Sequence, residues 1–408
     1  MSTHQSAAVR RTPRVRASYL TAVAIVLLLA LLAAAYRFVE WSPPPPAVRR
    51  AATGWEPVHG RFAGSESCRE CHQEIYDRQA ESAHALTLRS LKATEPRSPV
   101  GNGQGVVDPD TGARYEMVRD GSRCAISVQR AGAEARQPLD FEFGSGRRAF
   151  AYLGKTGDHE YLDARLNYYR KIGRWDFTSG QEKPLPTLLE QPLGRPLGPA
   201  DTALCFSCHT TVLRATGVEQ AGTPSSQVRL DLARSELGIR CERCHGPRQE
   251  HVRLFRAGAV PARPEKRSAV QINELCGECH TAPDVGPGHE GMARFQPLGL
   301  ARSECFKQSA GRLSCLSCHD PHSNAREDEA YYVSRCLSCH TPTAPASKPR
   351  GSTGKPCPVN PKEACVSCHM PRDSSSMLHI TFTDHWIRVP TRGSHNDLER
   401  AYTTRTLR

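Results

Sequence analysis

The sequence predicts a mainly α-helical and irregular fold with a small β-containing insert and one N-terminal transmembrane helix. Three features of the chain lead to this prediction. A Cys-x-x-Cys-His pentapeptide recurs seven times, hydrophobic residues make up only 38% of the 408 residues, and a single long apolar run lies near the N-terminus. The chain therefore has fewer apolar side chains than an ordinary enzyme of this length, and it needs other apolar material for its interior.

The recurring pentapeptide is the attachment motif of c-type haem. Its two thiols add across the vinyl groups of one porphyrin, and the adjacent histidine becomes an axial ligand of the iron. Chance would give about 0.03 matches at this composition, so the repeats indicate seven covalent haem c groups. The expected haem-linked cysteines are Cys68, Cys71, Cys205, Cys208, Cys241, Cys244, Cys276, Cys279, Cys315, Cys318, Cys336, Cys339, Cys365 and Cys368. The expected proximal iron ligands are His72, His209, His245, His280, His319, His340 and His369.

A zinc site is the alternative interpretation of paired cysteines next to a histidine. In zinc sites the residue after the second cysteine varies, whereas here a histidine follows it in all seven motifs. Haem also agrees with the composition, because seven porphyrins would supply the missing apolar surface. We therefore predict a haem-packed core and a chain that folds poorly without haem.

The net charge of +12 does not indicate a nucleic-acid partner. Residues 1–50 hold seven arginines against one glutamate, which accounts for half of this charge. The other half meets two propionates per haem, roughly −14 in total, so the basic side chains are expected to pair with propionates. We expect no nucleic-acid binding.

The N-terminal region predicts a membrane anchor. Residues 1–18 form a polar cytoplasmic tail with four arginines, and residues 19–39 contain an apolar run long enough to cross a bilayer. The positive-inside rule then places the rest of the chain on the periplasmic side of a bacterial inner membrane, behind a signal anchor. Small residues at 33–35 allow the alternative of export after signal cleavage. A proline-rich linker follows at residues 40–63.

The first haem motif lies in residues 64–100, where a helix is expected to follow it and to lead to His84. Residues 101–200 contain no motif and form the β-containing insert and its connector. Alternating or β-branched patterns predict short antiparallel strands at 114–118, 124–129 and 139–143. The aromatic stretch 144–176 is expected to pack a small core of the insert, and the proline-rich stretch 184–199 to connect it to the next domain.

The remaining six motifs lie in one haem domain, residues 201–395. Their spacings leave room for one helix and one loop per haem, but the linking segments differ, so the chain is not a regular solenoid. Residues 396–408 form a polar tail to which we assign no role.

Seven six-coordinate irons need seven further ligands, and nine other histidines follow the predicted membrane segment. His322 lies three residues after His319 and cannot easily reach the opposite face of the same haem, so it is expected to bind a neighbouring haem. His251, six residues after His245, invites the same argument. The expected distal ligands are His84, His251, His322, His379 and His385. Less favoured candidates are His59, His159, His289 and His395, together with Met117, Met292, Met370 and Met377.

Three cysteines lie outside the motifs: Cys124, Cys305 and Cys357. In an oxidising compartment the last two could form a disulfide across the final three haem motifs. We carry this pairing as a hypothesis.

Several segments carry a family resemblance. They are SESCRECHQEIYDRQAESAHALTLR at 65–89, GSGRRAFAYL at 144–153, YYRKIGRWD at 168–176, IRCERCHGPRQEHV at 239–252, SCLSCHDPH at 314–322, and CVSCHMP with the following HITFTDHWI. Across about residues 60–388 the chain resembles a family of bacterial multihaem cytochromes that includes the tetrahaem electron carrier of hydroxylamine oxidoreductase. The resemblance implies closely stacked haem pairs, mostly two-histidine ligation and periplasmic electron transfer. The chain departs from ammonia-forming nitrite reductases because it has no Cys-x-x-Cys-Lys motif.

The sequence therefore favours a heptahaem c-type cytochrome that exchanges electrons with redox protein partners, without catalytic residues of its own. Two alternatives stay open. One is a multihaem reductase or oxidase of a small nitrogen or sulfur compound at one open haem. The other is a membrane-anchored quinol dehydrogenase, for which quinol would be a partner.

Overall fold

The computed structural model describes residues 61–92, 94–182, 193–216, 229–263, 265–280, 292–340, 356–375 and 379–390. The predicted cytoplasmic tail, the transmembrane segment, almost all of the linker and the C-terminal tail lie outside these ranges. Within them, no helix is both long enough and apolar enough to cross a bilayer. The signal anchor thus stays a prediction from sequence.

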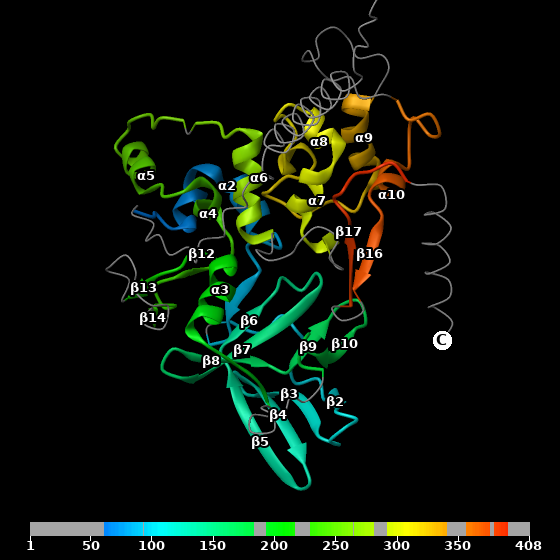
Figure 1. Ribbon diagram of the computed structural model, residues 1–408. Helices are drawn as coiled ribbons and strands as arrows, with labels where there is room; N and C mark the ends of the chain where they lie inside the picture. The colour runs from blue at the N-terminus through cyan, green and yellow to red at the C-terminus, as the bar shows by residue number, and fades with distance from the viewer. Residues whose placement is uncertain are drawn as a thin grey trace, which may run out of the picture. The chain divides into compact units, whose positions relative to one another are not determined.

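Two antiparallel sheets occupy residues 88–197 (Figure 1). The larger has seven strands in the order β1-β6-β7-β8-β11, with β9 pairing to β7 and β10 pairing to β9. The smaller has four strands in the order β2-β3-β4-β5. Their bounds are β1 Leu88–Ser90, β2 Gly105–Val107, β3 Arg114–Asp120, β4 Arg123–Arg130, β5 Ala133–Leu139, β6 Phe141–Phe143, β7 Ala149–Gly157, β8 Glu160–Ala164, β9 Leu166–Tyr169, β10 Arg174–Phe177 and β11 Gly194–Leu197.

Helices lie before and after these sheets in the sequence. Their bounds are η1 Ser65–Cys68, α2 Arg69–Ala80, α3 Pro199–His209, α4 Cys241–His245, α5 Gln249–Arg256, α6 Ala269–His280, η4 Met292–Arg294, α7 Gln296–Arg302, α8 Glu304–Gln308, η5 Cys315–Ser317, α9 Glu329–His340 and α10 Cys365–His369. Three two-stranded ribbons join them: β12 Thr210–Val212 with β15 Glu236–Leu237, β13 Ala215–Thr216 with β14 Arg229–Leu230, and β16 Arg372–Ser375 with β17 Ile380–Thr383.

The predicted fold class is wrong. The chain is a mixed α/β protein with substantial antiparallel sheets, rather than a mainly helical and irregular one with a small β insert. The aromatic stretch 144–176 forms strands as well as core, and part of the predicted connector is strand β11. The predicted haem domain also ends in a β-hairpin, β16–β17. The prediction underestimated the insert because its aromatic residues supply enough apolar surface for sheets that need no haem.

The insert builds its core from its own side chains. Hairpins set the register, and the turn between β4 and β5 uses Ala131 and Gly132, both with positive φ, as a tight two-residue hairpin turn requires. Ile126 and Tyr152 are fully buried in the resulting core. Below them Arg165, 3% exposed at its side chain, bonds to Asp108 at 2.8 Å. The core of the insert therefore encloses a buried ion pair among apolar side chains.

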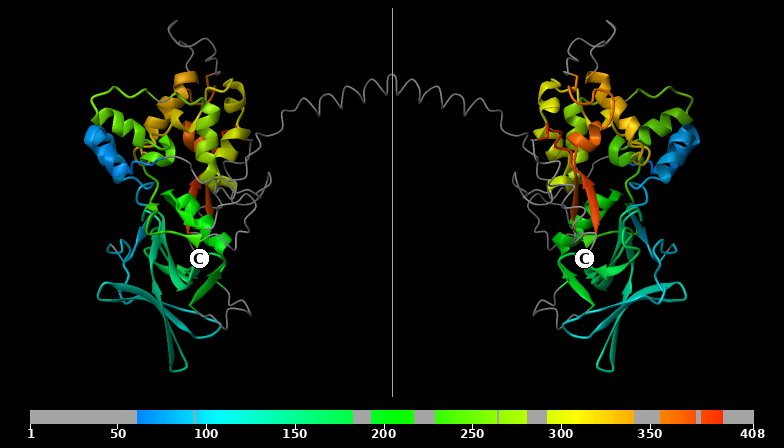
Figure 2. Two further views of the ribbon diagram at one scale, coloured as in Figure 1. Left: turned by 90° about the vertical axis from the view of Figure 1, so that its left-hand side faces the viewer. Right: turned by 90° about the vertical axis from the view of Figure 1, so that its right-hand side faces the viewer.

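The helical region after residue 239 is different. Within the described ranges, α5, α6, α8, α10 and η5 contain no buried residue. Buried apolar side chains in this region are Ala293, Leu300 and Val333. The helices and the sheets of the insert also occupy separate parts of the fold when it is turned to either side (Figure 2). These helices thus bury few of their own side chains.

Candidate functional site

The seven pentapeptides lie on short helical turns. Helices α3, α6 and α9 end at their motif histidines, and α4 and α10 consist of the pentapeptide alone. Residues three apart share one face of such a turn, so both thiols of a motif point the same way. This local geometry fits a planar group that is linked at two neighbouring points.

The structure gives no support to zinc. None of the seventeen cysteines forms a disulfide, and in the described part of the chain no three His, Cys, Asp or Glu side chains converge on a possible metal ion. The disulfide hypothesis for Cys305 and Cys357 is therefore wrong in this structure. The Cys357 thiol instead accepts the N–H of Asn360 at 3.4 Å, while burial raises the pKa of the Cys305 thiol on α8.

Four motif histidines face a second imidazole across a gap. The ring centroids lie 6.5 Å apart for His72 and His251, 6.1 Å for His280 and His84, 6.0 Å for His245 and His322, and 6.2 Å for His319 and His385. Two metal–nitrogen bonds of about 2 Å each, together with the depth of the two rings, span roughly 6 Å. Each gap therefore fits one iron ion between two imidazoles.

Each facing histidine comes from a segment that follows a different motif. His322, three residues after His319, faces His245 rather than His319. His251 likewise follows the motif of His245 but faces His72. These crossed pairs tie motifs that are distant in sequence into one site.

The insert positions His84. Just after His84, strand β1 pairs with β6, and Gly144 donates its N–H to the carbonyl of Thr87 at 2.6 Å. The carbonyl of His84 accepts the N–H of Ile239 at 2.9 Å. Burial lowers the pKa of the His84 ring, although a hydrogen bond to the Pro321 backbone opposes this shift. The imidazole of His84 is therefore neutral and faces His280.

The corner between α7 and α8 positions His385. The hydroxyl of Ser303 donates to the carbonyl of His385 at 3.1 Å. Gly299 lies so close that a Cβ there would meet the backbone N of Trp386 at 2.7 Å, which requires glycine at this position. The ring Nδ1 of His385 donates to the carbonyl of Thr383 at 2.9 Å.

Similar bonds orient the motif histidines. His369 donates from Nδ1 to the carbonyl of Arg388 at 2.9 Å, and His209 Nδ1 lies 2.7 Å from the Thr87 hydroxyl. A hydrogen bond at Nδ1 leaves Nε2 free to bind a metal. Burial also lowers the pKa of the imidazoles of His209, His245, His280 and His319, which keeps them in the neutral form that a metal ligand needs.

Thiols of different motifs lie against one another. The interacting pairs are Cys68 with Cys241, Cys208 with Cys279, Cys276 with Cys315, and Cys336 with Cys365. Other side chains link motifs as well: Arg243 of the His245 motif pairs with Glu278 of the His280 motif at 3.1 Å, and Asn273 accepts the N–H of Cys315 at 2.9 Å. The motifs therefore form a connected series rather than isolated sites.

Other predicted ligands have different surroundings. His379 faces Asp176 at 3.1 Å and the ring of Tyr169 at 4.8 Å, so it contacts strands β10 and β9 of the insert. Strand β17 separates it from His385, and the two rings have different neighbours. His159 lies in the turn between β7 and β8, and Met117 is buried in the insert. Outside the described residues lie His59, His289, His395 and Met377.

Among the described residues, His209 has an aromatic ring, Phe143, as its ring neighbour at 5.1 Å rather than a second imidazole. His340 ends α9, and His369 ends α10. For the motifs of His209 and His369, the described ranges show no facing histidine of the kind seen at the other four.

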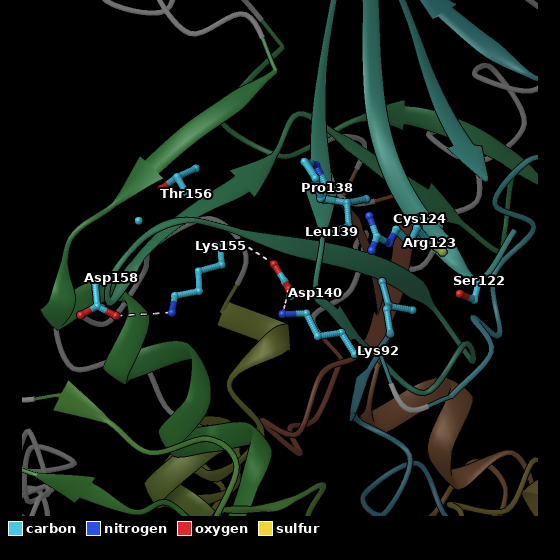
Figure 3. A pocket seen from close by; sticks show the side chains of 12 residues that line it. Lys92, Ser122, Arg123, Cys124, Pro138, Leu139, Asp140, Lys155, Thr156 and Asp158 are labelled. Atoms are coloured by element: carbon cyan, nitrogen blue, oxygen red, sulfur yellow. Dashed lines mark hydrogen bonds and ion pairs between the residues drawn. The ribbon is translucent and has the colours of Figure 1, made fainter. Parts of the chain in front are cut away.

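A surface hollow of about 650 Å³ lies on the insert (Figure 3). Ion pairs at its wall join Lys92 to Asp140 at 2.7 Å and Lys155 to Asp158 at 3.5 Å. None of its twelve lining residues belongs to a haem motif. The hollow is thus separate from the histidine pairs.

Comparison with known proteins gives one family. Residues 194–246, which include the motifs of His209 and His245, match the family "Cytochrome c554 and c-prime". The chain is a multihaem c-type cytochrome. The matched family implies covalent haem c and electron transfer. No curated protein matches this cytochrome. Among solved structures it is similar to the outer cell wall cytochrome OcwA, with 14% identity over 83% of this chain and 82% of that chain and a TM-score of 0.48.

Several residues that organise the cytochrome could not be recognised from the sequence patterns. Thr87 contacts His209, Asn273 joins two motifs, and Glu242 is a buried carboxylate inside a motif. None of them belongs to a pattern that marks a haem ligand. Only Glu242 had a usable signal, because it occupies a variable position of Cys-x-x-Cys-His.

Proposed function

We propose that this cytochrome carries seven covalent haems and passes electrons along them to a separate redox protein. Haem iron supplies one-electron chemistry between its ferric and ferrous states. The observation that carries the proposal is the set of four facing histidine pairs, each built from two different motif segments. Such pairs hold their sites rigidly and in contact, which suits a carrier.

The chain's residues would act as follows. The fourteen motif cysteines hold the porphyrins, and the seven motif histidines bind from one side. His84, His251, His322 and His385 bind from the other side. At these four sites two imidazoles would hold the iron and would leave no position for a substrate. We therefore favour a carrier over an enzyme.

The contacts between motifs suggest an order for electron movement. From the motif of His72, contacts lead to that of His245, through Cys68 and Cys241. From there Arg243 reaches Cys279 at 3.8 Å in the motif of His280. The further contacts lead to the motifs of His319, His340 and His369. The motif of His209 joins this series at Cys279, as a branch.

Intact mass and a reductive titration test the proposal together. The mature protein should carry seven haems, take up seven electrons reversibly, and give them up to soluble ferric cytochrome c. A mass with fewer than seven haems, or electrons that cannot be passed on, would contradict it.

The same sample tests the reductase alternative. A dominant high-spin ferric signal, with nitrite or hydroxylamine shifting the spectrum and being turned over, would replace the carrier with an enzyme. Spectra that these compounds leave unchanged would support the carrier.

A further inference from the structure

Glu242 is a buried carboxylate inside a haem motif. It is 2% exposed and lies between Cys241 and Cys244. Its two oxygens accept three backbone N–H groups, from Ala63 at 3.0 Å, Gly64 at 2.8 Å and Arg248 at 2.7 Å. No cationic side chain of the described residues forms an ion pair with it. Backbone amides alone therefore satisfy this buried negative charge.

The three amides belong to the parts that form one histidine pair. Ala63 and Gly64 lead directly into η1, which ends at Cys68 of the first motif. Arg248 precedes α5, which carries His251 opposite His72. One carboxylate thus joins the first motif, its own motif and the helix that supplies the facing imidazole.

The surroundings concentrate negative charge at the same place. Cys68 and Cys241 lie against each other at the junction of the two motifs, and the charges of Glu242 and Glu236 both act there. Glu236 also accepts the N–H of Ser65 at 3.2 Å. Two carboxylates therefore flank the junction of the two motifs, and Glu242 is the buried one.

We propose that Glu242 is a positioning residue that fixes the motifs of His72 and His245 against each other and lowers the reduction potentials of both haems. The proposal rests on the proposed function. A fixed negative charge in a buried setting favours ferric iron, which carries one more positive charge than ferrous iron. Because Glu242 is buried, water screens its charge little, and the charge acts on the haems of both motifs.

The substitution Glu242→Gln tests the charge of this side chain separately from its shape. Glutamine retains the size and one acceptor oxygen, but it removes the negative charge. In a spectroelectrochemical titration of the full, haem-loaded protein, two haems should shift to higher potential and the others should keep theirs. The control is Glu250→Gln, because Glu250 is exposed on α5 and bonds to Arg253 on the same helix. This control should shift no potential.

A haem-loaded E242Q protein with wild-type potentials would overturn the proposal. Hydrogen exchange of the wild-type protein provides a test that no variant's folding can affect. The amides of Ala63, Gly64 and Arg248 should exchange slowly because they donate hydrogen bonds to Glu242. Rapid exchange at these amides would also overturn the positioning role of Glu242.

Failure of the proposed function would look different. In that case the wild-type mass or peptide map would lack haem at Cys68 and Cys71 or at Cys241 and Cys244. Complete haem loading with unmoved potentials removes only the role of Glu242.

Discussion

Residues 88–197 and residues 239–388 of this cytochrome differ in what they bury. The first region packs aromatic and aliphatic side chains between antiparallel strands, and Ile126, Tyr152 and Leu166 are fully buried there. The second has helices with almost no buried side chains, but it places imidazoles in facing pairs about 6 Å apart. One chain thus combines a region with an interior of packed side chains and a region that buries few side chains but brings imidazoles together.

The two regions should therefore draw their stability from different sources. The strand region should keep its stability from apolar burial, which is of the order of 25 cal/mol per Å². The helical region should gain stability only when haem is attached, because binding to the folded state adds free energy to folding. Each experiment below changes one region and asks what happens in the other.

The largest effect is expected when haem cannot attach. Replacing the fourteen motif cysteines with serine should leave α4 to α10 without an interior, so their amides should exchange at rates typical of an unfolded chain. The strands β3, β4 and β7 should keep their protection. Hydrogen exchange with mass spectrometry measures both regions at once, and protected helices in the haem-free chain would break the comparison.

The next largest effect concerns the buried ion pair of the strand region. Asp108→Ala leaves Arg165 buried between Tyr115 and Phe177 without its partner. Loss of one partner of such a pair should reduce the free energy of unfolding by about 3–5 kcal/mol. Urea denaturation followed by Trp175 fluorescence measures this loss.

The haem spectrum of the Asp108 variant should not change, because the pair lies within the insert. Asp110→Ala is the matched control, since Asp110 is exposed two residues away, and it should alter stability by much less. Equal losses in both variants would show that the ion pair adds nothing.

A smaller effect is expected just outside the strand region, where Thr87 contacts the motif of His209. Thr87→Val removes the hydroxyl that lies 2.7 Å from Nδ1 of His209, a contact worth about 1 kcal/mol. The electron paramagnetic resonance signal and the potential of one haem should change, while Thr87→Ser should restore both. Wild-type spectra in the valine variant would show that the insert does not influence this motif.

The smallest effect is expected at Asp320. Its carboxylate lies 3.2 Å from Nδ1 of His322 and is 44% exposed, so water screens it. A carboxylate at this position makes the imidazole a stronger donor and favours ferric iron. Asp320→Asn should therefore raise the potential of one haem slightly in a redox titration, and a fall in that potential would contradict the assigned direction.

The motifs and their chemistry could be predicted because covalent haem attachment needs a local pattern of five residues. Spacing alone also excluded His322 from its own motif. The partners of the facing histidines could not be predicted, since they depend on which distant segments fold together. His379 and His385 illustrate this limit, because they lie on either side of strand β17 and yet one faces Asp176 and the other faces His319.

The fold class was misjudged for a related reason. The low overall content of apolar residues suggested that haem fills the whole interior, but those residues are concentrated in the insert. Buried and exposed residues do not alternate strictly along strands β7 to β10, because both faces of their sheet contact other parts of the chain. Strand β8, Glu160–Ala164, for example, is buried at three of its five positions. Glu242 was overlooked because charged residues are usually solvated.

Magnetic circular dichroism of the fully oxidised protein in the near infrared, combined with electron paramagnetic resonance, tests the central claim most directly. The claim is that facing imidazoles from different motifs hold the haems of the helical region. At least four low-spin ferric centres with two histidine ligands are expected. Fewer than four such centres in fully loaded protein would contradict the account.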